Sequence, residues 1–70
     1  MTFGQRLEHI LDKKNMKQKD LAELAGVNQL TVSRYVHDAR LPQMTVVIDI
    51  CKALNISADY LLGLKESEEI

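Results

Sequence analysis

The chain has no tryptophan, one cysteine and one proline among its 70 residues, and it has no long apolar run. Cys51 cannot form an internal disulfide, and because it lies inside the apolar pattern VVIDICKAL we expect a small buried core residue. A membrane-spanning helix needs about 20 apolar residues, and a secretory signal has its own pattern. Neither pattern is present, so the sequence predicts a cytoplasmic protein.

The groups needed for catalysis or metal binding are also missing. His9, His37 and Cys51 fall on separate predicted elements without metal-ligand spacing, and no serine or cysteine nucleophile has a base nearby in the pattern. A chain of this length forms one domain with a net stability of only a few kcal/mol. We therefore expect neither an enzyme nor a protein that carries a metal or cofactor.

A basic surplus, which nucleic-acid binders usually show, is absent from the chain as a whole, whose net charge is −1. Residues 1–40 contain seven Lys and Arg against five Asp and Glu, a net charge of +2. Residues 41–70 contain two against five, a net charge of −3. This asymmetry favours an anion-facing first half and an acidic rear, although proteins that bind nothing anionic also reach it.

The apolar periodicity is helical throughout, without a strand pattern or an internal repeat. Thr2 and Gln5 have the spacing of a capping box, which predicts a first helix that starts at Phe3. Four further helices are predicted: a second from Gln18, a third after Asn28, a fourth over about Met44–Leu54 and a short fifth over Ala58–Leu62. The fold class is thus all-α, with one domain over residues 1–64 and an acidic, mobile tail over residues 65–70.

Most helix ends carry residues suited to them. Ser57 can cap the fifth helix, and Asn15, Gly26, Asp38, Asn55 and Gly63 can adopt the left-handed conformation that ends a helix or a turn. The exception is Lys17, which cannot cap the second helix. We expect that end to fray slightly or to be satisfied by a bound phosphate.

Residues 18–37, QKDLAELAGVNQLTVSRYVH, are the most informative segment. Two short helical patterns meet there at Gly26, with Ala22 small enough for a close crossing and Asn28 placed to cap the second helix. Neither helix is long enough to be stable alone. A sharp crossing of this kind leaves the outer face of the second helix free to enter a DNA major groove.

Four blocks, RLEHIL, QKDLAELAGV, SRYVHDARLP and CKALNISADYLLGL, resemble the phage-repressor/Cro-type (Xre-like) helix-turn-helix proteins over nearly the whole chain. The resemblance implies a five-helix, sequence-specific, double-stranded DNA-binding regulator of bacterial or phage origin, with a repressor as the expected type. It also implies major-groove reading by the third helix and a dimer on an inverted-repeat operator. No cofactor is expected.

On the third helix, we expect one face to be buried, with Val32, Tyr35 and Val36 pointing inward. We expect the side chains on the opposite face to read bases. Arginine can bridge guanine O6 and N7, glutamine can bridge adenine N6 and N7, and leucine can lie against a thymine methyl group. Glutamine and arginine also occur on ordinary solvated faces, so the resemblance supplies the assignment of Gln29, Leu30 and Arg34 as main readers. The full expected set is Gln29, Leu30, Ser33 and Arg34.

Phosphate contacts are expected from elements that flank the groove. Gln18 matches a phosphate-contacting glutamine of the family, and free N–H groups at the start of the second helix add an anion site. The expected set is Lys17, Gln18, Asn28, Thr31, His37 and Arg40.

The chain departs from the family where a buried Arg–Glu pair joins the first and third helices, because Leu11 and Val36 occupy the matching positions. Replacing both charged partners with apolar groups can be neutral, whereas losing one leaves an unpaired buried charge. The paired change predicts that Leu11 and Val36 pack together. Asp38 likewise stands where the family prefers glycine.

The fourth helix carries more apolar residues than one buried stripe needs, which favours a self-association surface. The predicted interface is Val46, Ile48, Ile50, Leu62 and Leu64, in a homodimer that forms either freely or only on DNA. The same surplus fits a protein-interaction or antitoxin-type module on this fold. The chain can also be the N-terminal part of a longer regulator.

Overall fold

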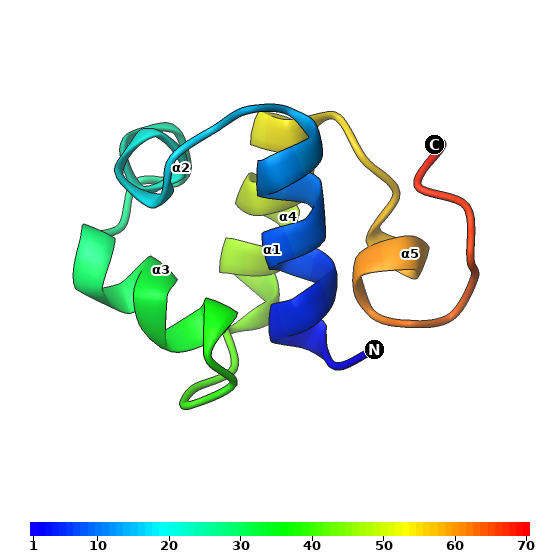
Figure 1. Cartoon of the computed structure of the whole chain (residues 1–70), viewed down its shortest axis with the longest axis horizontal. Helices are drawn as coiled ribbons and strands as arrows, with labels where there is room; N and C mark the ends of the chain where they lie inside the picture. Colours follow the sequence, from blue (N-terminus) through cyan, green and yellow to red (C-terminus); the bar gives the residue numbers. More distant parts are fainter.

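The computed structural model describes all 70 residues and contains five helices and no strand (Figure 1). These are α1 (Phe3–Lys13), α2 (Gln18–Ala25), α3 (Gln29–Val36), α4 (Met44–Leu54) and α5 (Ala58–Leu61). Helix α3 packs against α1 and α2, while α4 packs against α2 and α5. The predicted all-α fold is confirmed. None of the helices has the length and apolar character needed to cross a membrane.

One apolar core joins all five helices. Its most deeply buried side chains come from every helix: Leu7, Ile10, Leu21, Val32, Ile50, Leu54 and Leu61. Phe3, Leu7, Ile10 and Leu11 of α1 are buried, and Cys51 is buried as predicted. Leu11 and Val36 are also buried in this core, on two helices that pack together. Because α2, α3 and α5 are too short to persist alone, their stability depends on this shared burial.

The helix ends follow the sequence closely. Thr2 Oγ1 accepts a hydrogen bond from the Gln5 N–H at 3.1 Å, and Gln5 Oε1 accepts one from the Thr2 N–H at 2.8 Å. Ser57 caps α5, but Lys17 gives α2 no side-chain cap, as predicted. The Asp20 carboxylate instead accepts the Lys17 N–H at 3.1 Å, half of a capping box.

All five residues predicted to be left-handed have positive φ. The values are 54° for Asn15, 74° for Gly26, 57° for Asp38, 54° for Asn55 and 85° for Gly63. Gly26 ends α2 and lets α3 begin three residues later, which produces the sharp crossing of the two helices.

The backbones of α1 and α3 approach closely at Gly4. A Cβ atom on Gly4 would lie 2.6 Å from the carbonyl oxygen of Tyr35 and would also meet the carbonyl of Val36. Only a glycine allows α1 to cross the end of α3 at this separation. The capping-box pattern of Thr2 and Gln5 spans Gly4 but gives no indication of this contact.

Asp38, in the turn that follows α3, caps the start of α1 from another part of the chain. Its Oδ1 accepts the Gly4 N–H at 2.8 Å, and its Oδ2 accepts the Thr2 hydroxyl at 2.5 Å. The hydrogen bond from Thr2, followed by that from Gly4, lowers the pKa of the Asp38 carboxyl. We call these two contacts the Asp38 clamp.

The short helix α5 is fastened to α1 by Arg6. Its Nε donates to the Leu61 carbonyl at 3.1 Å, and its Nη1 donates to the Met1 carbonyl. The guanidinium lies so close to Gly63 that a Cβ atom there would be 2.7 Å from Nη2. Arg6 therefore satisfies a carbonyl group at the end of a helix too short to hold its own geometry.

Residues 65–70, expected to be mobile, fold back over the C-terminal half of α1. The Ser57 N–H donates to the Glu68 carbonyl at 3.0 Å, and the Glu68 carboxylate lies 2.5 Å from Lys13 Nζ and 3.8 Å from His9 Nε2. Exposed ion pairs of this kind add little stability. A domain boundary at residue 64 stays a prediction.

Gly4→Ala tests the close crossing of α1 and α3. Alanine normally favours a helix over glycine by about 1 kcal/mol. Here the added methyl group must displace the α3 backbone, so we expect the free energy of unfolding to fall by about 1–3 kcal/mol in a denaturant titration. Glu8→Ala, at an exposed site on α1, should leave it nearly unchanged. Equal or greater stability of Gly4→Ala would contradict this geometry.

The Asp38 clamp predicts a stability difference that depends on pH. Because the carboxyl pKa is lower in the folded chain than its ordinary value, its stabilising effect is complete above about pH 4 and is lost as the pH falls through the folded pKa. Asp38→Asn should therefore melt below the parent at neutral pH, with the two melting temperatures converging in acid. Asp49→Asn, at an exposed carboxyl without a hydrogen-bond partner, is the control. A difference independent of pH would rule out the charged clamp.

Candidate nucleic-acid interface

Helix α3 is held with one face in the core and the other in solvent. Val32, Tyr35 and Val36 are buried, and Asn28 caps the start of the helix by accepting the Thr31 N–H at 2.8 Å. Gln29, Leu30 and Arg34 are exposed on the other face. Leu30 is 59% exposed, which is high for an apolar side chain at the start of a helix. The inward and outward sets are those that the sequence predicts.

Ser33, the fourth expected base reader, is half-buried and lies one turn before His37. His37 Nδ1 is 2.8 Å from the Ser33 carbonyl oxygen and 3.5 Å from its hydroxyl. A carbonyl can only accept, so Nδ1 carries the hydrogen and Nε2 remains free. The imidazole thus closes the end of α3, and in the neutral ring Nε2 is a hydrogen-bond acceptor.

Three expected phosphate contacts share a polar cleft between the turn before α3 and the start of α4. Asn28, Thr31 and Arg40 line it together with Gln43, the residue before α4. Asn28 Oδ1 already accepts from the Thr31 N–H and, at 2.9 Å, from the Thr31 hydroxyl, so only its amide NH2 can reach an anion. Gln43 gives α4 no side-chain cap, so the first N–H groups of α4, next to the cleft, lack a side-chain partner.

Sequence reasoning missed Gln43. A usable indication was present, because the fourth helix follows Pro42 without a serine, threonine, aspartate or asparagine at its cap position. Lys17 and Gln18 do not line this cleft. They lie at the other uncapped helix start, that of α2, where Lys17 is exposed and Gln18 half-buried.

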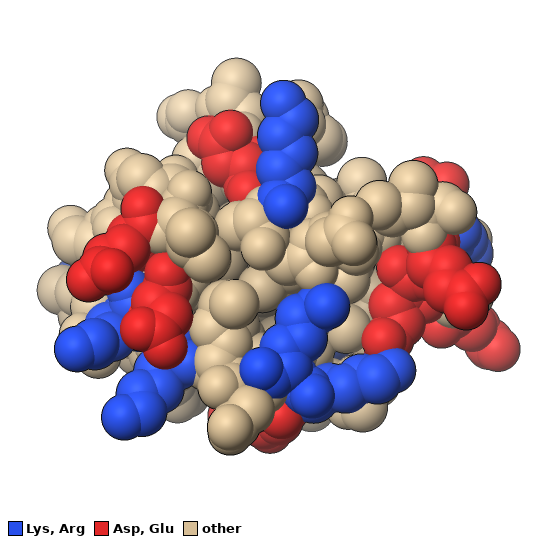
Figure 2. Space-filling view, turned by 90° about the horizontal axis from the view of Figure 1, so that it is seen from above, with Lys and Arg blue, Asp and Glu red and all other residues tan.

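Acidic side chains gather at the end of the molecule that carries α5 and the C-terminal tail (Figure 2). Toward the end that carries α2 and α3, basic and acidic side chains alternate in this view. The acidic end agrees with the net charge of −3 carried by residues 41–70.

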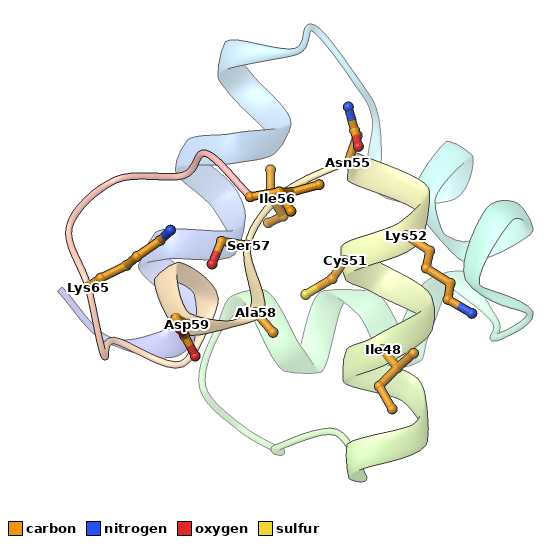
Figure 3. Close-up of a pocket in the computed structure, with 10 residues that line it drawn as sticks. Ile48, Cys51, Lys52, Asn55, Ile56, Ser57, Ala58, Asp59 and Lys65 are labelled. Carbon is orange, nitrogen blue, oxygen red and sulfur yellow. The ribbon is translucent and has the colours of Figure 1, made fainter.

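The largest hollow lies elsewhere, between the outer face of α4, residues 55–59 and the tail (Figure 3). Ile48 and Ile70 contribute apolar walls, and Lys65 reaches over it from the tail but is held by the Glu69 carbonyl at 2.6 Å. Cys51 lies at its floor, where burial raises the pKa of the thiol. A protonated thiol is a weak nucleophile, so this hollow lacks a reactive group.

The structure does not gather the five predicted interface residues on one surface. Ile50 is 0% exposed, so its assignment to an interface is wrong: its position in the helix repeat faces the core rather than solvent. Val46 packs against the core and lines the cleft beside α3, whereas Ile48 lines the hollow on another face of α4. Ile48, Leu62 and Leu64 remain exposed.

The fold and the exposed α3 define a helix-turn-helix domain of the phage-repressor type. Residues 7–61 match the family model described as helix-turn-helix, and the chain belongs to that family. The predicted phage-repressor/Cro-type resemblance is confirmed.

One curated relative is the HTH-type transcriptional regulator ImmR of Bacillus subtilis (strain 168). It is 33% identical over 66 residues, which are 94% of this chain and 52% of ImmR. The chain thus spans about half the length of this relative. Another regulator of the same organism, YqaE, is 26% identical over 68 residues, 97% of this chain and 59% of its own.

Among solved structures, the P22 c2 repressor in complex with a synthetic operator superposes with a TM-score of 0.87 at 26% identity. The match covers 93% of this chain and 98% of that one. The restriction-modification controller protein C.AhdI of Aeromonas hydrophila has a TM-score of 0.81 at 29% identity, covering 84% and 89%. These proteins are regulators and not enzymes, in agreement with the prediction for this chain.

Proposed function

We propose that this protein is a sequence-specific, double-stranded DNA-binding transcriptional regulator of the repressor type that reads the major groove with α3. The observation that carries the proposal is the exposed face of α3, where Gln29, Leu30 and Arg34 stand beside one another. The operator complex of the P22 c2 repressor and the regulatory role of ImmR support it.

The proposed readers differ in chemistry and therefore in the bases they suit. The Arg34 guanidinium pairs with guanine O6 and N7, and the Gln29 amide with adenine N6 and N7. Leu30 contributes an apolar contact to a thymine methyl group, and the half-buried Ser33 hydroxyl can hydrogen-bond a base edge that comes close to α3. Together these side chains read a few adjacent base pairs.

Phosphate contacts fix the register of α3 without carrying sequence information. We assign one flank to the cleft formed by Asn28, Thr31, Arg40 and Gln43, and the other to Lys17, Gln18 and the uncapped N–H groups of α2. His37 lies near the end of α3, and its Nε2 can donate to a phosphate only when both ring nitrogens carry a hydrogen. The flanks offer few net charges, so binding of one domain should have a shallow salt dependence.

One short recognition helix reads too few bases to single out a genomic site, so we propose a symmetric dimer on an inverted repeat. Two half-sites about one helical turn apart would then be read together. The proposed surface is centred on Ile48 of α4; Leu62 and Leu64, which follow α5, are the other exposed apolar residues of the predicted interface. Its small size favours a dimer that forms on DNA rather than freely.

Selection of binding sites from a random duplex library tests the function directly. We expect an enriched inverted repeat. Failure to enrich any sequence would overturn the proposed function and favour the protein-interaction module.

On the selected site, Arg34→Ala should weaken binding by about 1–3 kcal/mol and flatten the preference at one base position in each half-site. Lys52→Ala removes an exposed cation from α4, away from α3, and should change neither quantity. Direct readout by Arg34 would be refuted by a variant with the parent's affinity and base preference.

Ile48→Asn tests the proposed dimer surface. Ile48 is 46% exposed, so the variant should fold. The ratio of affinity for the full operator to affinity for a half-site should fall about fivefold or more, because the two subunits lose their coupling. Leu24→Asn, at a leucine on α2 that is 60% exposed, should leave this ratio unchanged. A stoichiometry of one chain per high-affinity operator in ultracentrifugation would defeat the dimer model.

A further inference from the structure

Asp38 occupies a left-handed position at which a glycine would be free of strain, with φ of 57°. Its carboxylate makes contacts that glycine cannot make. One oxygen accepts the Gly4 N–H and the other accepts the Thr2 hydroxyl, across 34 and 36 residues of sequence. The Asp38 clamp thereby joins the turn after α3 to the start of α1.

The connector beyond this turn has few other attachments. The N–H groups of His37, Asp38 and Ala39 donate back into α3, and the next backbone hydrogen bonds are those accepted by the Gln43 carbonyl at the start of α4. Residues 40–42 neither donate nor accept a backbone hydrogen bond. Arg40 and Leu41 are also exposed.

Arg40 is therefore held between two anchors, the Asp38 clamp two residues before it and Gln43, the residue before α4, three residues after it. Its side chain lines the polar cleft with Asn28, Thr31 and Gln43. A left-handed turn released from α1 would shift the connector and move the guanidinium relative to α3. The placement of a long cation matters because its contact with a phosphate is directional.

We propose that Asp38 is a positioning residue of the DNA interface, which holds the connector against α1 so that Arg40 meets a backbone phosphate in register with α3. This inference rests on the proposed DNA-binding function. The positioning role and simple electrostatics predict opposite changes in DNA affinity when the Asp38 charge is removed. An aspartate close to DNA should repel phosphate, so removing its charge should tighten binding, whereas the positioning role predicts weaker binding.

The test is a double-mutant cycle of Asp38→Gly and Arg40→Ala on the selected operator, at a temperature at which every variant is folded. Glycine keeps the left-handed turn and removes the clamp. Asp38→Gly should weaken binding about two- to tenfold, the equivalent of one hydrogen bond, and should reduce the salt slope by up to about 0.9. With Arg40→Ala already present, Asp38→Gly should cause no further loss.

Asn55→Gly is the matched control, because Asn55 is also left-handed but ends α4 away from the cleft. It should leave DNA affinity and salt slope unchanged. If Asp38→Gly is unfolded at the working temperature, Asp38→Asn replaces it in the cycle, with the same direction expected. Tighter or unchanged binding by the Asp38 variant overturns the positioning role, as does an equal loss with and without Arg40.

Different results would contradict the DNA-binding function and the positioning role of Asp38. If the parent protein selects no DNA sequence, the proposed function itself is wrong. If the parent binds and Arg34→Ala weakens it while the Asp38 and Arg40 effects are additive, DNA binding stands and only the positioning role is lost.

Discussion

The crossing of α1 over the end of α3 is the contact on which the rest of the structure depends. Gly4 lets the two backbones approach closely, and the Asp38 clamp then ties the turn after α3 to the start of α1. This crossing fixes the inward face of α3 and thereby its outward face. A helix of eight residues cannot hold its own orientation, so α1 must supply it.

The proposed interface contains free N–H groups and an exposed apolar side chain, which a stable fold normally covers. Helices α2 and α4 both begin without a side-chain cap, and Leu30 is left in solvent. Free helix N–H groups suit anions, and an exposed leucine suits a thymine methyl group. Each is slightly unfavourable in the free protein, and each gains a partner on duplex DNA in the proposed complex.

The weak overall charge affects how such an interface can work. With a net charge of −1 and acidic groups gathered around α5 and the tail, the protein as a whole has little general electrostatic attraction for DNA. Recognition then depends on a few well-placed contacts, and the position of each cation matters more than the number of cations. The geometry of the connector is therefore important, because it sets the position of the Arg40 side chain.

The sequence by itself determined the helices, most of their caps, the left-handed exits and the buried face of α3, because these follow from local periodicity and residue type. Gln29, Leu30 and Arg34 could be placed outward for the same reason. Only the tertiary structure decided which distant segments come into contact. The Asp38 clamp, the close approach that requires glycine at position 4, the polar cleft that includes Gln43 and the contacts of Glu68 all involve residues far apart in sequence. Ile50 is a residue that the sequence led us to place wrongly. An excess of apolar residues indicates a spare surface, but which of them lie on it depends on how α4 is rotated against its neighbours, and side-chain packing alone sets that rotation.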